Sequence, residues 1–441
     1  MKKNIAAAVA ASMAFATLCG CSQKPANANT TTTPDSGSTS TASTQATGEG
    51  APSTGVTLTM VHNLVGANAD AIAAACQEFT TETGIGVEIQ APGSSYEETL
   101  KTRMAANTLP DIWTTHGWSI ARYSEYLRPL TDQPFAGKIV PSIKSLITDE
   151  NGDFFTLPIN VELSGMMYNR EVVDELGIDV DAIHTWDDFT AALKTCSDAG
   201  YIGLDVGGKD TWTIGQMFDI MAPGFLTSND ANNQRQALLD GTFDWENWRP
   251  ICELMDSWNQ AGYINVDCLT SDYNTSAKAL ASGKVAFMMS NTSIVQDAVK
   301  ANPDIKLGIM PVPTTSADDP TFLIGGEQTA FGMWKDGEHQ EEALQLLNFL
   351  ARPEISGMIA SSTTLPAGLS DATSDTGMLT DCFAKYANEK TISYFDREYL
   401  PSGMWDDMSA TGAMVLSKEP GSIDAAVSQM AQSYTDKIAQ Q

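Results

Sequence analysis

Apolar residues from position 56 onward alternate between two spacings. Short runs rich in β-branched and aromatic residues predict buried strands at residues 56–61, 87–90 and 111–114. Apolar residues three and four positions apart predict helices over residues 69–83, 96–107 and around 120–126. This order of strands and helices predicts a largely parallel sheet that helices cover on both faces.

The alternation continues with different spacings toward the C-terminus. Further strands are predicted at residues 166–168, 285–289, 306–310 and 329–334. Further helices are predicted over residues 169–176, 186–199, 245–261, 276–282 and 338–351, and through the last 60 residues. Thr185 is a favourable N-cap for the helix that begins at residue 186. Trp248 and Trp258 lie on the apolar stripe of their helix, so we assign both side chains to the core.

The N-terminal region has another composition. Lys2 and Lys3 precede an apolar stretch over residues 5–18, which is too short for a good membrane span and is typical of an export signal. Residues 22–54 contain no Val, Leu, Ile, Met or aromatic residue. Such a segment cannot bury enough apolar surface to offset its chain entropy, so we expect a disordered tether.

Charge and cysteine usage narrow the possible partners. The chain has 25 basic and 55 acidic residues, a formal net charge of -30, which disfavours nucleic acid and anionic lipid surfaces as partners. The four histidines lack metal-ligand spacing, and no pair of cysteines is spaced Cys-x-x-Cys, so no metal or cofactor is expected. We expect buried single thiols at Cys76, Cys196, Cys252, Cys268 and Cys382.

Four stretches, in order, resemble one known family, the extracellular sugar-binding proteins of ABC importers that include maltose-binding protein. They are residues 109–113 (LPDIW) with 126–130, residues 157–162 (LPINVE) with 167–170, residues 283–288 (GKVAFM), and Gly325-Gly326 before Phe331. In addition, Leu18-Cys19-Gly20-Cys21 resembles the bacterial lipobox, whose final cysteine becomes lipidated.

The resemblance implies an α/β, two-lobe periplasmic-binding-protein fold of type II, with mostly parallel sheets flanked by helices and a hinge between the lobes. It implies crossings between lobes near residues 160–163, 314–323 and 366–370. The expected parts are a signal peptide (1–20), a lipidated Cys21 with its tether (21–54), lobe 1 (55–161 with 320–368) and lobe 2 (162–319 with 369–441).

The implied function is that of a monomeric lipoprotein, anchored to the cell membrane and facing outside. It would deliver a mono- or oligosaccharide to the permease subunits of an ABC transporter by cleft closure, without catalysis. Two alternatives stay open: a surface glycan hydrolase that uses two carboxylates, and a binding protein for a peptide or polyamine. The sequence contains no Gly-x-Ser-x-Gly, His-Glu-x-x-His or P-loop motif.

Sugars are bound by aromatic faces and by planar polar groups, which are found where strands end at their carboxyl edge. The aromatic candidates are Trp118, Trp212 and Trp405. By resemblance, Glu162 falls on a position that carries a sugar-binding carboxylate. The other polar candidates are Asn63, His116, Asp210, Asn291 and Glu327. Gly325 and Gly326 resemble a loop whose backbone approaches the ligand.

We expect Trp118→Ala and Trp212→Ala each to weaken ligand binding by ~1–3 kcal/mol, because each removes an aromatic face from the site. Calorimetric titration measures the loss, and an unchanged melting temperature of the ligand-free variant shows that the fold is intact. Undiminished affinity in both variants would remove these residues from the site.

Overall fold

The computed structural model describes residues 54–116, 123–228, 233–387 and 389–439. The export signal, Cys21, almost all of the tether and Trp118 lie outside these residues, as does most of the helix expected around residues 120–126. Within the described residues, no helix is long and apolar enough to cross a membrane.

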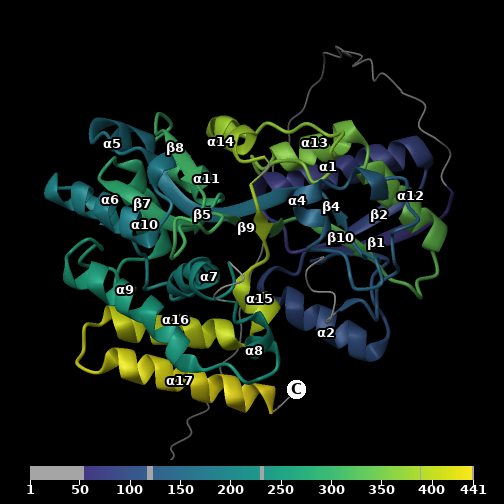
Figure 1. Ribbon diagram of the computed structural model, residues 1–441. Helices are drawn as coiled ribbons and strands as arrows, with labels where there is room; N and C mark the ends of the chain where they lie inside the picture. The colour runs from purple at the N-terminus through teal and green to yellow at the C-terminus, as the bar shows by residue number, and fades with distance from the viewer. Residues whose placement is uncertain (1–53, 117–122, 229–232, 388, 440–441) are drawn as a thin grey trace, which may run out of the picture. The chain divides into compact units, whose positions relative to one another are not determined.

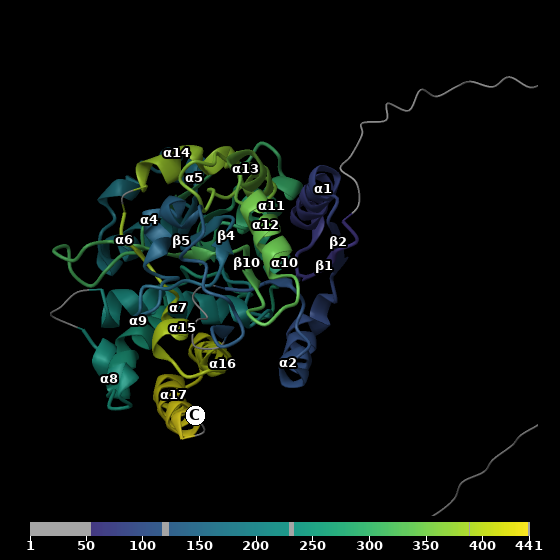
Figure 2. The same cartoon turned by 90° about the vertical axis from the view of Figure 1, so that its right-hand side faces the viewer.

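The first sheet has the strand order β2-β1-β3-β10-β4. Its strands are β1 (Thr57–Val61), β2 (Gly86–Gln90), β3 (Ile112–Thr114), β4 (Leu157–Pro158) and β10 (Ala330–Met333). Strands β2 and β3 run parallel to β1, whereas β10 runs antiparallel to both β3 and β4. One face is covered by α1 (Gly66–Thr83), α12 (Gln340–Leu350) and α13 (Pro353–Ser361), and α2 (Tyr96–Ala106) lies across the other (Figure 1, Figure 2).

The second sheet is built around one long strand, β5 (Val161–Asn169). Three strands pair with it antiparallel: β7 (Val285–Asn291), β8 (Leu307–Met310) and β9 (Leu323–Glu327). Two short strands extend the sheet in parallel, β6 (Ile202–Leu204) on β7 and β11 (Thr391–Ile392) on β9. The α/β fold class is therefore confirmed, but the sheets are mixed rather than mostly parallel, because every pairing of β5 is antiparallel.

The chain passes between the sheets close to two of the three predicted places. The first passage is at residues 159–160, between β4 and β5, as predicted. The second lies at residues 328–329, between β9 and β10, and not at residues 314–323, because β9 pairs within the second sheet. The third follows residues 367 and 369, which bridge to Asn160 and Ile139, and precedes β11. Residues 323–327 thus differ from the predicted lobe assignment, and the lobe boundaries as a whole stay a prediction.

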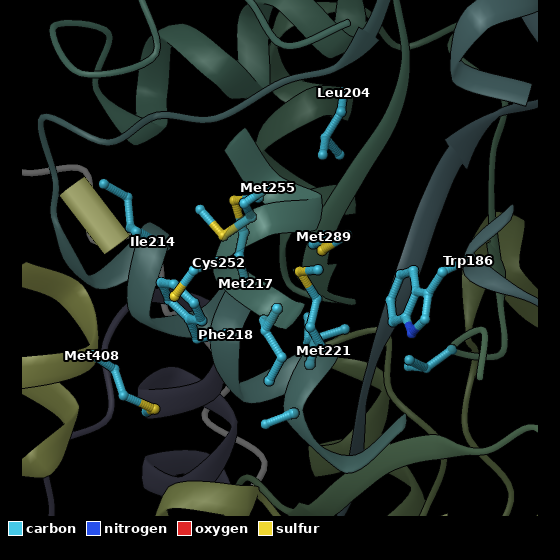
Figure 3. Packing of buried hydrophobic residues seen from close by; sticks show 14 of the residues in the cluster. Trp186, Leu204, Ile214, Met217, Phe218, Met221, Cys252, Met255, Met289 and Met408 are labelled. Carbon is cyan, nitrogen blue, oxygen red and sulfur yellow. The ribbon is translucent and has the colours of Figure 1, made fainter. Parts of the chain in front are cut away.

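The core of the second sheet contains a helix that the sequence analysis missed, α7 (Trp212–Leu226). All its residues except Trp212 and Phe225 are buried, so it has no polar face and shows no amphipathic period. The helix is also hard to predict from the sequence because it contains Gly215, Pro223 and Gly224, and both glycine and proline are unfavourable in helix interiors. Figure 3 shows side chains of α7 among those of neighbouring helices; the labelled ones include Met217, Phe218, Met221, Cys252, Met255 and Met408.

The helix predicted over residues 245–261 is divided in two. It begins as a 3₁₀ turn, Trp245–Trp248, and continues as α9 (Arg249–Gln260), whose first turn holds Pro250. Proline suits this position because the first helical N–H groups have no intrahelical acceptor. Trp248 and Trp258 are fully buried, which confirms their assignment to the core.

The remaining helices support the second sheet or connect the two sheets. They are α4 (Pro141–Lys144), α5 (Arg170–Glu175), α6 (Trp186–Asp198), α8 (Arg235–Leu239), α10 (Tyr273–Ala281), α11 (Ile294–Ala301), α14 (Thr380–Lys385), α15 (Phe395–Tyr399), α16 (Met404–Leu416) and α17 (Ser422–Ile438). Thr185 caps α6 in a reciprocal capping box with Asp188, which confirms the predicted cap. Helices α16 and α17 lie side by side at the C-terminus (Figure 1).

All five described cysteines are buried and free, as the sequence predicts. Burial raises the pKa of Cys196 to about 11 and the pKa of both Cys76 and Cys252 to about 12. Because the thiolate is the reactive form, these thiols are chemically inert in the folded protein.

We therefore expect the variant C19S/C21S, which keeps only these five thiols, to react with a thiol reagent at least about a hundredfold more slowly when native than when denatured. Absorbance of the released aromatic thiol measures the rate. Rapid labelling of any one thiol in the native protein would contradict its buried position.

Candidate functional site

Polar side chains gather at the carboxyl edge of the first sheet. Asn63 follows β1 and His116 follows β3, and these two strands are parallel neighbours. The Thr114 hydroxyl lies 3.2 Å from Asn63 Oδ1 and 2.9 Å from the Tyr96 hydroxyl. Asn63, Tyr96, Thr114 and His116 line one recess together with Gln328, which comes from the passage between β9 and β10. The edge that the sequence analysis expected to bind ligand is therefore a polar recess.

Glu162 lies at the start of β5, where the chain enters the second sheet. Its Oε1 accepts a hydrogen bond from Ser293 Oγ at 2.6 Å and another from Gln328 Nε2 at 3.2 Å. Burial raises the pKa of Glu162; the Ser293 bond, the Arg397 charge and the Gln328 bond act in the opposite direction. The two donors and Arg397 therefore favour the ionised carboxylate in a place poorly accessible to water.

Glu327 lies at the end of β9 and is the second carboxylate of this region. Its side chain is fully buried, and its Oε1 lies 3.4 Å from His116 Nδ1, with 38% of the His116 side chain exposed. This contact joins the segment after β3 to a strand of the second sheet. His116 and Glu327 are thus brought together, as a pair that links the two sheets.

Aromatic side chains converge on the first turn of α7. Trp212 is 40% exposed, and its ring centroid lies 5.1 Å from that of Tyr273, the first residue of α10. Trp405, in the first turn of α16, is half-buried and packs on Gly215, where an added Cβ would lie 3.1 Å from Trp405 Cε2. Gly215 therefore allows an indole to lie directly against the helix backbone. The first turn of α7 thus has an aromatic ring on two sides.

Two acidic side chains, Asp219 of α7 and Asp396 of α15, lie close to each other. Asp219 is buried, and its Oδ1 accepts a hydrogen bond from the backbone N–H of Asp396 at 2.8 Å. Burial raises the pKa of Asp219, and the neighbouring Asp396 carboxylate raises it further. The neighbouring carboxylate disfavours the charge of Asp219, because like charges repel. The nearby charge of Arg397 acts on these groups and on Glu162.

No group of three or more His, Cys, Asp or Glu side chains among the described residues is arranged to hold a metal ion.

Comparison with known proteins identifies the family. The model of a family described as bacterial extracellular solute-binding protein matches residues 65–356. The melibiose/raffinose/stachyose-binding protein MelE of Bacillus subtilis (strain 168) is 34% identical over 331 residues, which are 74% of this chain and 77% of MelE. This chain belongs to the extracellular solute-binding protein family.

Two solved structures of this kind are similar over most of their length. A binding protein named MsmE from Bacillus subtilis, in an open conformation, has a TM-score of 0.82 and 31% identity, covering 87% of this chain and 98% of that one. A sugar transporter from Bacillus licheniformis, in complex with stachyose, has a TM-score of 0.73 and 32% identity, covering 86% and 100%. Both likenesses confirm the two-lobe fold of the solute-binding proteins.

Two of the ligand-binding residues predicted from the sequence of this solute-binding protein accept hydrogen bonds from the backbone. Asp210 Oδ2 accepts from the backbone N–H of Tyr273 at 2.9 Å, and Asn291 Oδ1 accepts from that of Ser293 at 3.2 Å. Both side chains therefore hold the segments that carry other site residues. Their contact with ligand stays a prediction, as does that of Asn63, His116, Glu162, Trp212, Glu327 and Trp405. Trp118 lies outside the described residues.

Gly325 and Gly326 are not in a loop, contrary to the sequence analysis. Both lie in β9, opposite Leu163 and Glu162 of β5. An added Cβ on Gly325 would lie 2.9 Å from the Leu163 and Thr391 side chains and 3.0 Å from the Glu162 carbonyl oxygen. Gly325 therefore permits close packing of β5, β9 and β11.

The sequence analysis did not identify five residues around Glu162. Ser293 and Gln328 donate to its carboxylate, while Tyr273, Tyr394 and Arg397 lie close enough for electrostatic interaction with it. Tyr394 also places its hydroxyl 3.3 Å from Ser164 Oγ, two residues along β5. Ser293 lies two residues after the candidate Asn291, and its residue type alone does not mark it. Gln328 had a signal, since it follows the Gly-Gly-Glu stretch directly.

Because the folded-state pKa of Glu162 is raised, the folded protein binds this proton at a higher pH than the unfolded chain does. The contribution of Glu162 to the unfolding free energy therefore increases as the pH falls from 7 through the folded pKa, and becomes constant below the unfolded pKa of about 4.3. We therefore compare the melting temperatures of the ligand-free parent protein and of E162Q. We expect the parent value minus the E162Q value to rise as the pH falls through this window. A flat difference, or one that falls with falling pH, would contradict the raised pKa of this carboxylate.

Proposed function

We propose that this solute-binding protein captures a neutral oligosaccharide outside the cell and delivers it to an ABC permease by closure of its two lobes. The observation that carries the proposal is Glu162, whose Oε1 accepts hydrogen bonds from Ser293 and Gln328 at the junction of the two sheets. A carboxylate in this setting accepts hydroxyl protons well, because the donors already fix its position.

The aromatic residues on α7 support a sugar as ligand. An exposed indole, Trp212, packed on Tyr273 offers a rigid apolar face to the C–H surface of a pyranose ring. Trp405, in the first turn of α16, is the second candidate platform and packs on Gly215 of α7. Such rings lose little conformational entropy on binding, so they are favourable anchors for a weakly hydrophobic ligand.

The charge arrangement supports a neutral ligand over a polyamine. Arg397 offsets Glu162 electrostatically, and burial raises the pKa of both Asp219 and Asp396, which disfavours their charged forms. A polyamine needs ionised carboxylates with no cationic partner of their own. The names of the similar proteins, which bind melibiose, raffinose and stachyose, point to oligosaccharides of this size.

We also propose that the chain is exported, lipidated at Cys21 and held near the membrane by residues 22–54. The resemblance of Leu18-Cys19-Gly20-Cys21 to a lipobox supports this, together with the composition of the segment that follows. In this arrangement the protein acts as a monomer and without enzymatic activity, and the permease subunits are its partners.

A panel of ligands tests the proposal by thermal shift. Melibiose, raffinose and stachyose should stabilise the protein, by about 2.7 kcal/mol at a concentration one hundred times the Kd. Spermidine and a tripeptide serve as controls and should have no effect. Chromatography of the sugar after incubation should return it unchanged. Stabilisation by the amine or peptide alone would reject the carbohydrate, and release of a shorter sugar would establish a hydrolase.

A further inference from the structure

A buried amide lies behind the site, at the first passage between the sheets. Asn160 is fully buried, and its Oδ1 accepts a hydrogen bond from the backbone N–H of Thr329 at 2.8 Å. Its Nδ2 donates to Thr363 Oγ1 at 2.9 Å and to Gln328 Oε1 at 3.4 Å. A backbone N–H cannot reverse its polarity, so it determines which end of the Asn160 amide faces Gln328.

The orientation of Asn160 in turn determines that of Gln328. Since Asn160 presents a donor, Gln328 must present its oxygen to it and its Nε2 to the other side. On that side Nε2 lies 3.2 Å from Glu162 Oε1 and 3.4 Å from Ser293 Oγ. A single direction of donation thus runs from the Thr329 backbone through two amides to the carboxylate.

Both hydrogen bonds to the carboxylate from described residues go to the same oxygen. Ser293 and Gln328 meet at Glu162 Oε1, so Oε2 is the oxygen that can accept from a ligand. Donors on Oε1 match the ionised carboxylate and oppose a proton on that oxygen. The amide chain therefore orients the Glu162 carboxylate and favours its ionised form.

The connected residues come from the segments that join the two sheets. Asn160 precedes β5, Gln328 and Thr329 lie between β9 and β10, and Thr363 follows α13. Ser293 is the N-cap residue of α11, after β7 of the second sheet. The amide chain thus spans the two main passages of the polypeptide between the sheets.

We propose that Gln328, held in one orientation by Asn160, is the positioning residue that aims the Glu162 carboxylate at the ligand and favours its ionised form. The affinity for a ligand therefore depends on two amides, of which Asn160 is buried behind Glu162. This inference rests on the proposed function for the identity of the ligand. The effect of Gln328 on Glu162 does not depend on it, because both side chains interact in the ligand-free protein.

Other charged and titratable groups face the same carboxylate and must be held constant in a test. They are His116 after β3, Tyr273 of α10, and Tyr394 and Arg397 at α15; Glu327 of β9 acts through its contact with His116. None of these groups is altered in the variants below.

The test is a titration of Glu162 without ligand. The carboxyl ¹³C resonance of Glu162, assigned as the glutamate signal that E162Q removes, is followed against pH in the parent, in Q328L and in Q296L. Gln296 is the matched control, because its Nε2 donates to Thr363 O at 2.5 Å in the same region but does not reach Glu162. We expect Q328L to move the titration midpoint upward, because a donor to the carboxylate is lost. Q296L should leave the midpoint unchanged.

Binding of stachyose is the second readout, and we expect Q328L to lower the affinity at pH 7 by about tenfold, the usual effect of losing a hydrogen bond to a charged group. If Q328L does not fold, Q328E replaces it; this variant also lacks the donor and adds a like charge, so the midpoint should move further upward. An unchanged midpoint in the folded Q328 variant, or an equal shift in Q296L, would overturn the positioning role. Failure of the parent to bind any sugar would reject only the proposed function.

Discussion

A carboxylate placed at the junction of two sheets must have hydrogen-bond donors, and much of the arrangement around Glu162 follows from that need. An ionised group that is poorly accessible to water is costly unless its oxygens are hydrogen-bonded. Ser293 supplies one donor from the second sheet, and Gln328 supplies another from the passage to the first. The hydrogen bonds to the Glu162 carboxylate therefore connect segments that are far apart in the sequence.

The polarity of this arrangement has its origin in the backbone. The N–H of Thr329 orients Asn160, and Asn160 orients Gln328. Because Asn160 is fully buried, water cannot substitute for a missing partner there, so a single orientation is favoured. A residue at the strand passage thus affects a group that ligand is expected to touch, without contacting ligand itself.

The packing of α7 explains why the aromatic platforms are rigid. Nearly the whole helix is buried, and Figure 3 shows its Met217, Phe218 and Met221 in the core. Trp186, Phe189 and Trp258 pack edge-to-face or tilted in the same core. The first turn reaches the surface and carries Trp212, while Trp405 packs on Gly215. Close-packed interiors allow little displacement, so the rings have nearly fixed positions.

The sequence alone determined the α/β class, most elements with an amphipathic or alternating period, the buried free thiols and the cap at Thr185. These features depend on local spacing or on residue type, both of which are visible along the chain. It failed for α7, whose uniform burial removes the period, and for Gly325 and Gly326, whose role as close-packed strand residues depends on β5 and β11.

Only the tertiary structure decided which residues surround Glu162. Ser293, Gln328 and Arg397 lie more than one hundred residues from it along the chain, and of the three only Gln328 adjoins a stretch that the sequence marks. Whether an amide presents its oxygen or its nitrogen to a neighbour is a property of the assembled network, since it depends on every donor and acceptor in reach. That information arises only when the segments between the two sheets come together.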